Sequence, residues 1–241
     1  MLWATPRSTS TAFEWMMRMR NDMKCYHEPF GEAWYKGEDA RSPRDLRSDQ
    51  RIPGLSFASV WQNLVSAAQT GPVFSKDFPH YIKHMWSDDF LGHFNHSFLI
   101  RDPAKVTTSM FKHWPEFHLD EVGVVEQREL FDRLAEQTGE APPVIDSDDL
   151  LENPDAMVAA WCQATGIPFI AEALTWEPGD RDEVSWYDGG SWHDNLRVST
   201  GLKPQPRKYI DISDAPDRVR EIYQACLPHY EHMYSHRITA G

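Results

Sequence analysis

The stretch LWATPRSTST, residues 2–11, decides the fold of this chain. Its first four residues form a short apolar run, and a helical pattern begins near Thr9. The turn between them holds a proline, an arginine and several hydroxyl side chains. A strand that passes directly into a helix is typical of α/β proteins with a parallel sheet. The stretch therefore predicts the first strand–helix unit of an α/β fold.

Further short apolar runs, each flanked by Gly, Pro or Asp, predict buried parallel strands at residues 23–28, 72–77, 97–102 and 142–146. Periodic segments predict helices at residues 9–22, 57–69, 104–113, 124–137 and 215–234. This alternation indicates a doubly wound parallel sheet. Ligands of such sheets bind beyond the carboxyl ends of the strands, so the residues there are the candidate site.

Two segments interrupt the alternation. Residues 37–53 are charged and rich in turn formers, which indicates an exposed loop or lid. Residues 176–206 contain three tryptophans with little periodicity. Long irregular stretches in compact proteins are usually functional or mobile, although a surface loop anchored by Trp186 and Trp192 is an equal alternative.

Composition excludes several classes of protein. With 241 residues, 41% of them hydrophobic, the chain can build a core, so wholesale disorder is excluded. The net charge of −13 argues against DNA or a polyanionic glycan as partner, though a compact anion in a local pocket is still compatible. We find neither a membrane-spanning stretch nor a signal pattern, and the three cysteines are widely spaced. We therefore expect a cytoplasmic protein without membrane or nucleic-acid partners; no motif indicates its oligomeric state.

The turn at residues 5–11 has the features of an anion site. A strand-to-helix turn points free backbone N–H groups at one place, and the helix dipole adds partial positive charge there. Ser10 and Thr11 add hydroxyl donors, and Arg7 adds forked donors suited to phosphate or sulfate. The turn contains no glycine and lacks the GK[ST] ending of a Walker A motif. The simpler alternative is an ordinary capped helix start.

A second anion site is predicted after the fourth strand. Arg101 stands at the strand's carboxyl end, followed by Asp102 and Pro103. Ser109 lies eight residues later, about two helical turns along the next helix. Two donors at this spacing could flank one phosphate, but the pattern is weak when taken alone.

Together these segments resemble the sulfotransferases that use 3′-phosphoadenosine 5′-phosphosulfate (PAPS). Residues 6–11 match that family's P-[KR]-S-x-[ST]-T turn, and residues 101–109 match its R-[DN]-P-x(5)-S motif. Residues 144–169 are similar to its third conserved segment, so the resemblance covers roughly the first 170 residues. A His-Glu-Pro-Phe box at residues 27–30 is similar to a bacterial and plant branch.

The resemblance implies a three-layer, P-loop-NTPase-like α/β fold with a central parallel sheet flanked by helices. It implies one domain over residues 1–241, with a cofactor-binding core at about residues 1–170, then an irregular loop and a C-terminal helix. Three features depart from the cytosolic branch. Phe78 stands where that branch has its basic histidine, Ala12 replaces its adenine-stacking tryptophan, and Lys203 alone stands near its C-terminal R-K-G loop.

The function implied by the resemblance is sulfuryl transfer from PAPS to a hydroxyl or amine of a small-molecule acceptor, with 3′-phosphoadenosine 5′-phosphate (PAP) as product and no metal. Arg7 would contact the transferring group, and Arg101 and Ser109 would hold the 3′-phosphate. The residues implied for cofactor binding are Pro6, Arg7, Ser8, Thr9, Ser10, Thr11, Arg101, Ser109 and Lys203.

Three acidic or basic side chains at strand ends are candidates for the general base. Glu28 ends the second strand and is our first candidate, although it could instead cap the next helix. Asp77 and His80 are the reserve candidates at the end of the third strand, and Lys76 could contact the transferring group.

Two other functions stay open. One is a P-loop-like kinase or nucleotide phosphotransferase, which the missing Walker A glycines disfavour. The other is a sulfotransferase-like protein that binds a nucleotide without catalysis.

Overall fold

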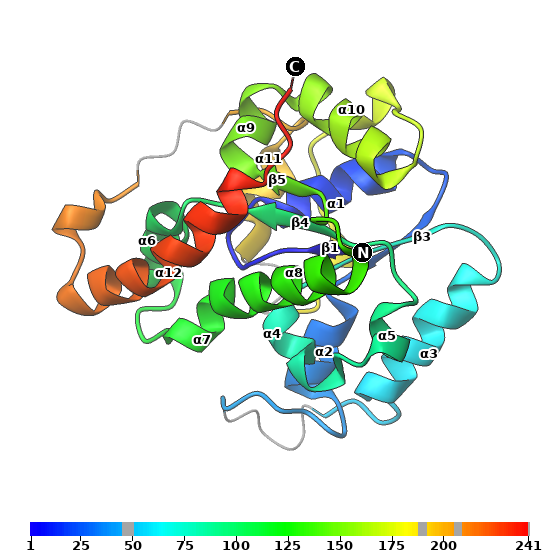
Figure 1. The fold of residues 1–241 in the computed structure, drawn as a ribbon, viewed down its shortest axis with the longest axis horizontal. Coiled ribbons are helices and arrows are strands. Elements are labelled where there is room, and N and C mark those ends of the chain that lie inside the picture. The colour runs from blue at the N-terminus through cyan, green and yellow to red at the C-terminus, as the bar shows by residue number, and fades with distance from the viewer. Residues whose placement is uncertain (45–50, 188–191, 205–208, 241) are drawn as a thin grey trace.

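A computed structural model describes residues 1–44, 51–187, 192–204 and 209–240. Its five strands, all parallel, form one sheet in the order β2-β3-β1-β4-β5 (Figure 1). The strands are β1 (Leu2–Trp3), β2 (Lys24–His27), β3 (Val73–Asp77), β4 (Ser97–Ile100) and β5 (Val144–Asp146). Each lies within one of the predicted runs, so the α/β prediction is confirmed.

The helices described are α1 (Ser10–Met19), α2 (Pro29–Lys36), α3 (Phe57–Ala68), α4 (Pro79–Ile82), α5 (Asp88–Leu91), α6 (Pro103–His113), α7 (Leu119–Val122), α8 (Val124–Thr138), α9 (Ser147–Glu152), α10 (Pro154–Thr165), α11 (Asp194–Val198) and α12 (Asp217–Ser235). The five predicted helices correspond to α1, α3, α6, α8 and α12. Within the described part of the chain, no helix combines the length and apolarity needed to span a membrane.

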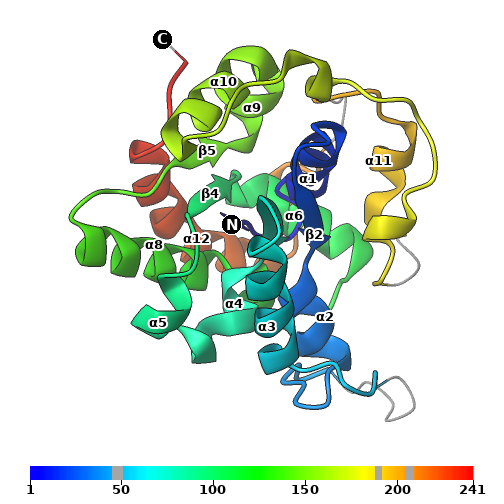
Figure 2. The same cartoon turned by 90° about the vertical axis from the view of Figure 1, so that its right-hand side faces the viewer.

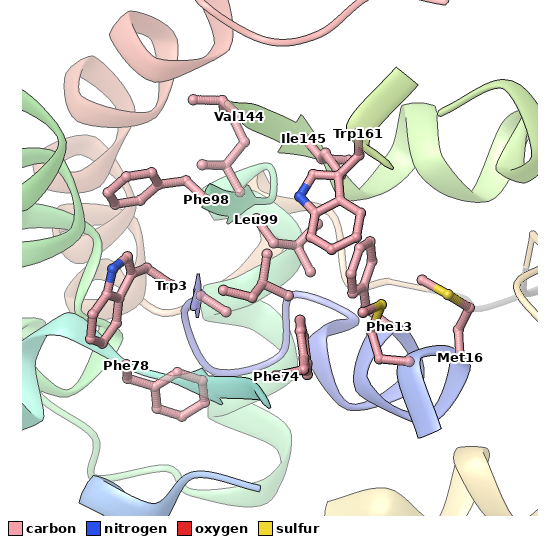
Figure 3. Packing of buried hydrophobic residues seen from close by; sticks show 14 of the residues in the cluster. Trp3, Phe13, Met16, Phe74, Phe78, Phe98, Leu99, Val144, Ile145 and Trp161 are labelled. Carbon is pink, nitrogen blue, oxygen red and sulfur yellow. The ribbon is translucent and has the colours of Figure 1, made fainter. Parts of the chain in front are cut away.

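Helices cover both faces of the sheet, which gives three layers (Figures 1 and 2). On one face the Phe13 ring of α1 lies 4.9 Å from the Trp161 ring of α10, and both contact Phe74 of β3. On the other face Phe98 of β4 contacts Phe131 of α8. Figure 3 shows Phe13, Phe74 and Trp161 on the side of the sheet opposite Phe98. Burial of large aromatic side chains on both faces explains why the strands are short apolar runs.

The strand register brings the carboxyl ends of the strands to one edge. Trp3 pairs with Asp77 and with Phe98, and His27 pairs with Lys76. The segments that follow β1 to β5 therefore all start at this edge, as predicted for the candidate site.

In the described part of the irregular stretch predicted at residues 176–206, the beginning of the stretch is bonded to residues near its end. An antiparallel bridge joins Thr175 to Gly201, and the Trp176 indole donates to Ser199 Oγ at 2.9 Å. Gly201 has a φ of +149°, and a Cβ there would lie 2.7 Å from the Leu174 carbonyl oxygen, so the bridge requires glycine. Residues 188–191 and 205–206 of this stretch, and residues 45–50 of the predicted loop at 37–53, lie outside the described residues.

One buried side chain ties the central strands to the helix layer. The Gln127 amide of α8 donates to the carbonyl oxygens of Trp3 (3.1 Å) and Leu99 (3.0 Å). Gln127 is 1% exposed, so these carbonyls depend on it in a place that water does not reach.

We expect Gln127→Met to lower the free energy of unfolding by about 2 kcal/mol, because methionine keeps the volume but leaves buried acceptors without a donor. The exposed residue Gln137 on the same helix provides the control. Urea titrations of both variants measure the difference. Equal stability of the two variants would contradict a structural role for the amide.

Candidate functional site

A pocket opens at the carboxyl edge of the sheet. The turn at residues 6–11, the end of β2, the segment after β4 and described residues of 186–187 and 192–204 all contribute to its wall. Of the predicted site residues, the wall contains Pro6, Arg7, Ser8, Thr9, Ser10, Thr11, Glu28, Arg101 and Lys203. Residues from distant parts of the sequence thus meet at the predicted edge.

The turn before α1 forms a cradle without glycine. Arg7 and Thr9 adopt left-handed backbone conformations, with φ of 64° and 71°. This conformation is costly for residues other than glycine and clusters at functional sites. Thr9 caps α1 without a side-chain hydrogen bond to any described residue, so the first N–H groups of the helix stay available to an anion. The Ser8 hydroxyl donates to the Thr5 carbonyl at 2.6 Å, so this side chain closes the turn.

Arg7 connects three parts of the pocket. Its Nε donates to Ser109 Oγ of α6 at 3.0 Å, and a terminal nitrogen donates to the Trp192 carbonyl at 2.8 Å. The guanidinium also lies over the Trp192 ring, 5.5 Å from its centroid. The structure therefore places Ser109 beside Arg7, where the sequence had assigned Ser109 to the second anion site.

Arg101 lies at the end of β4 and is 4% exposed. One terminal nitrogen donates to the Arg7 carbonyl oxygen at 2.7 Å, and the other donates to the Tyr209 hydroxyl. Its Nε is buried and has no hydrogen-bond partner among the described residues. Lys203 lies on the same wall, where its Nζ donates to Thr200 Oγ1 at 3.0 Å. This end of the pocket thus carries cationic donors whose described partners here are neutral oxygens.

Glu28 lines the pocket and also occupies the N-cap position of α2, where its side chain makes no capping hydrogen bond. Its φ of 44° ends the strand alternation of β2 and directs the chain into α2. One carboxylate oxygen accepts a hydrogen bond from Lys76 Nζ. Burial favours the neutral acid, but Lys76 and then His27 outweigh burial and lower the pKa of Glu28 below its usual value. Glu28 is therefore ionised at neutral pH.

Lys76 has no exposed surface, so it does not contact a ligand in this structure, contrary to one prediction from the sequence. A buried ammonium group requires a charged partner, and Glu28 is that partner. Lys76 is therefore a positioning residue for the Glu28 carboxylate.

A second carboxylate lies behind Glu28. Glu14 of α1 is fully buried and contacts His27 Nδ1 at 2.5 Å and Arg18 at 2.8 Å. The other ring nitrogen of His27 lies 3.9 Å from the Glu28 carboxylate. Burial would raise the pKa of Glu14, but His27, Lys76 and Arg18 together lower it to about 2. The ionised Glu14 carboxylate and the His27 ring thus form a buried polar layer behind the pocket wall.

His193 is a pocket residue that the sequence analysis missed. Its ring lies 5.4 Å from that of His27. Burial, then the charges of His27 and Lys76, lower the pKa of His193 to about 3, so this imidazole is neutral at pH 7. Trp192, Tyr209 and Lys105 also line the pocket and were not predicted as site residues. Trp192 and Tyr209 lie in segments without a local motif, and their contacts with Arg7 and Arg101 were not readable from the sequence. Lys105 lies within the motif at residues 101–109, which could have indicated it.

The two reserve candidates for the base do not line the pocket in the described structure. The Asp77 carboxylate is buried and accepts from the backbone N–H groups of Phe30 (2.7 Å) and Phe78 (2.9 Å). Burial and the charge of Glu28 raise the pKa of Asp77 well above its usual value. His80 packs beside Tyr81 and Gly123, and burial lowers its pKa to about 3. Asp77 ends β3 and His80 follows shortly after it, as the sequence indicated, but both side chains are directed into the protein and not into the pocket.

Comparison with known proteins identifies the family. Residues 1–237 match the sulfotransferase domain family. Two proteins of Arabidopsis thaliana, branched-chain-amino-acid aminotransferase-like proteins 2 and 1, are 30% and 27% identical to the chain over 97% of its length. The chain spans only 41% and 42% of the length of these two relatives.

A solved sulfotransferase domain has the same overall fold. The domain from the Synechococcus PCC 7002 olefin synthase superposes with a TM-score of 0.50 at 13% identity, covering 93% of this chain and 92% of that one. This superposition, together with the family match, confirms the sulfotransferase fold predicted from the motifs. The domain from the curacin biosynthetic pathway gives a TM-score of 0.49 at 14% identity, covering 93% of this chain and 95% of that one.

The buried layer yields a stability prediction. Glu14→Gln should lower the free energy of unfolding at pH 7 by about 3 kcal/mol, because it removes one partner of a buried ion pair. The pKa of Glu14 is about 2 in the folded protein, against 4.5 ordinarily, so its ionisation stabilises the fold above about pH 4.5. That contribution disappears as the pH falls toward about 2, and the difference between wild type and variant should narrow over this window.

Denaturant titrations at several pH values measure this difference. Glu136→Gln, at an exposed position of α8, is the control and should change stability by less than about 0.5 kcal/mol. A difference that stays constant between pH 7 and pH 3 would contradict the assigned charge state.

Proposed function

This chain belongs to the sulfotransferase domain family, and we propose that it moves a sulfuryl group from PAPS to a hydroxyl or amine of a small-molecule acceptor. The observation that carries the proposal is that two anion-binding groups share one pocket: the turn at residues 6–11 and Arg101. PAPS carries phosphates at both the 5′ and 3′ positions, and this second phosphate distinguishes it from ATP.

The residues present fit such a cofactor. At the turn, α1 begins without a side-chain cap, so its N–H groups and dipole suit the 5′-phosphate. At the second position, the buried Arg101 Nε lacks a described partner, which suits the 3′-phosphate. Lys203 adds a third cation on the same wall. Ala12 also lines the pocket but cannot stack on the adenine as a tryptophan would, so the stacking contact would come from another part of the wall.

Arg7 is the residue placed for transition-state stabilisation. When bound, PAPS supplies the sulfuryl group and keeps the S–O bond electrons on its 5′-phosphate oxygen as PAP. Arg7 and the N–H groups of the turn neutralise this growing negative charge in a preorganised way. Ser109 holds the Arg7 side chain at 3.0 Å, which keeps the guanidinium at the mouth of the turn.

Glu28 is the residue that would accept the acceptor's proton. It lines the pocket, it is ionised at neutral pH, and its carboxylate is held by Lys76 and backed by His27. As the acceptor oxygen or nitrogen bonds to sulfur, its proton passes to a carboxylate oxygen of Glu28. Lys76 is positioned to keep the carboxylate oriented while it changes charge.

Cofactor class is testable by calorimetry. We expect PAP to bind more tightly than ATP with Mg²⁺, and Arg101→Met to weaken PAP binding about 30-fold while binding of adenosine 5′-phosphate is unchanged. Arg133→Met, at a surface ion pair, is the control. Tighter binding of ATP than of PAP would favour the kinase alternative. An equal loss of affinity for PAP and for adenosine 5′-phosphate in Arg101→Met would contradict the assignment of Arg101 to the 3′-phosphate.

The base assignment is testable by kinetics. Glu28→Gln should lower kcat by at least about 100-fold, since general bases contribute on this scale, while the Kd for PAP changes little. Glu32→Gln, one turn along α2 and outside the pocket wall, is the control. Acceptor turnover measured with labelled PAPS gives kcat, and thermal unfolding verifies that both variants are folded. Full turnover by Glu28→Gln would refute the assignment.

A further inference from the structure

The pocket has a second half whose character differs from the cofactor end. Beyond Glu28, its wall is built mainly from aromatic side chains of α2, of the segment after β3, of the C-cap of α6 and of residues 186, 187 and 192. These side chains are Tyr35, Phe78, Tyr81, Trp114, Trp186, Tyr187 and Trp192. We refer to them as the aromatic wall.

The aromatic wall is continuous. The Tyr81 ring lies 5.4 Å from Phe78 and 5.8 Å from Tyr35, and Tyr35 in turn lies 5.2 Å from Tyr187. The Trp192 ring lies 6.1 Å from Tyr187 and 5.8 Å from Trp114. Separations of this size are those of interacting rings, so each ring restricts its neighbours. The wall therefore offers flat apolar surfaces in a fixed arrangement.

The acidic side chains of this pocket are already neutralised. Among the described residues that line it, the acids are Glu28, Glu121 and Asp148. Each of them forms an ion pair within the protein, with Lys76, Arg44 and Lys105 respectively.

Of these three ion pairs, the one at the aromatic wall is bidentate. Arg44 donates to both carboxylate oxygens of Glu121, at 2.6 and 2.7 Å, and its guanidinium lies 3.3 Å from the centroid of the Trp114 ring. A two-fold hydrogen bond combined with stacking holds the arginine in place. Arg44 thus removes the negative charge of Glu121 from the acceptor's side of the pocket.

We propose that the acceptor is an uncharged molecule with a flat aromatic body that presents a hydroxyl group to Glu28; this proposal rests on the proposed function. The body would stack on the aromatic wall. A cationic acceptor would find no uncompensated carboxylate among the described lining residues, while Lys76 lies directly behind Glu28. A sugar-like acceptor would need hydrogen-bond partners for several hydroxyl groups, and ring faces do not supply them.

Size-matched probes test the proposal. They are 4-ethylphenol (neutral and aromatic), tyramine (the same body with an ammonium group) and 4-ethylcyclohexanol (neutral and not aromatic). We expect 4-ethylphenol to bind the PAP-loaded protein at least about 10-fold more tightly than either of the others, and to show the same order in kcat/KM with PAPS. Tryptophan fluorescence and saturation-transfer NMR measure binding independently of turnover.

The outcomes separate the two proposals. Tighter binding of tyramine or 4-ethylcyclohexanol, or no binding of any of the three probes while PAP binds, overturns the acceptor assignment and leaves the cofactor assignment standing. Failure of PAP itself to bind in calorimetry overturns the proposed function instead.

A variant that removes the positive charge of Arg44 tests the role of the Arg44–Glu121 pair. Arg44→Met should free the Glu121 carboxylate and raise the kcat/KM of tyramine relative to 4-ethylphenol about fivefold, the size of one exposed ion pair. Arg51→Met is the control, because Arg51 belongs to the same loop but donates to the backbone carbonyls of Tyr35 and Gly37 and has no described carboxylate partner. An unchanged ratio in Arg44→Met would refute the role assigned to the Arg44–Glu121 pair.

Discussion

The ion pair between Lys76 and Glu28 is the constraint on which the site depends. Parallel pairing of β2 with β3 places Lys76 beside His27, where it has no access to water. An ammonium group in that position is tolerated only with a charged partner, and the left-handed turn of the backbone at Glu28 supplies one. The same turn begins α2 and brings the Glu28 carboxylate to the pocket. One ion pair therefore links the pairing of β2 with β3, the start of α2 and the position of the Glu28 carboxylate in the pocket.

Around this pair, the pocket divides into two chemically different halves. The half proposed for the cofactor consists of N–H groups and cations at the ends of β1 and β4, which are tied together because Ser147 Oγ lies within hydrogen-bonding distance of the carbonyl oxygens of both Ser8 and Ile100. The other half is aromatic and has its carboxylates neutralised. The surplus of acidic residues in the chain, which leaves a net charge of −13, therefore says little about the pocket itself. The charge of the pocket is set by the ion pairs of its own side chains.

Much of the fold and the cofactor end could be predicted from local patterns. Five short apolar runs became the five parallel strands, and the turn at residues 6–11 with Arg101 came to one edge because carboxyl ends of parallel strands share it. The directions of side chains could not be predicted. Asp77 and His80 stand near a strand end as expected, yet Asp77 accepts backbone N–H groups and His80 packs against Gly123. Which way such side chains point depends on neighbours that are distant in sequence.

By itself the sequence determined the α/β class, the sulfotransferase family resemblance and the strand-to-helix turn at residues 6–11, because each depends on periodicity or on a contiguous motif. Only the tertiary structure decided that Glu14 backs His27, that Ser109 holds Arg7, and that Trp192 and His193 enter the pocket. These contacts join residues from 13 to 185 positions apart, across segments with no shared pattern. Their geometry follows from packing and burial, which no local stretch of sequence encodes.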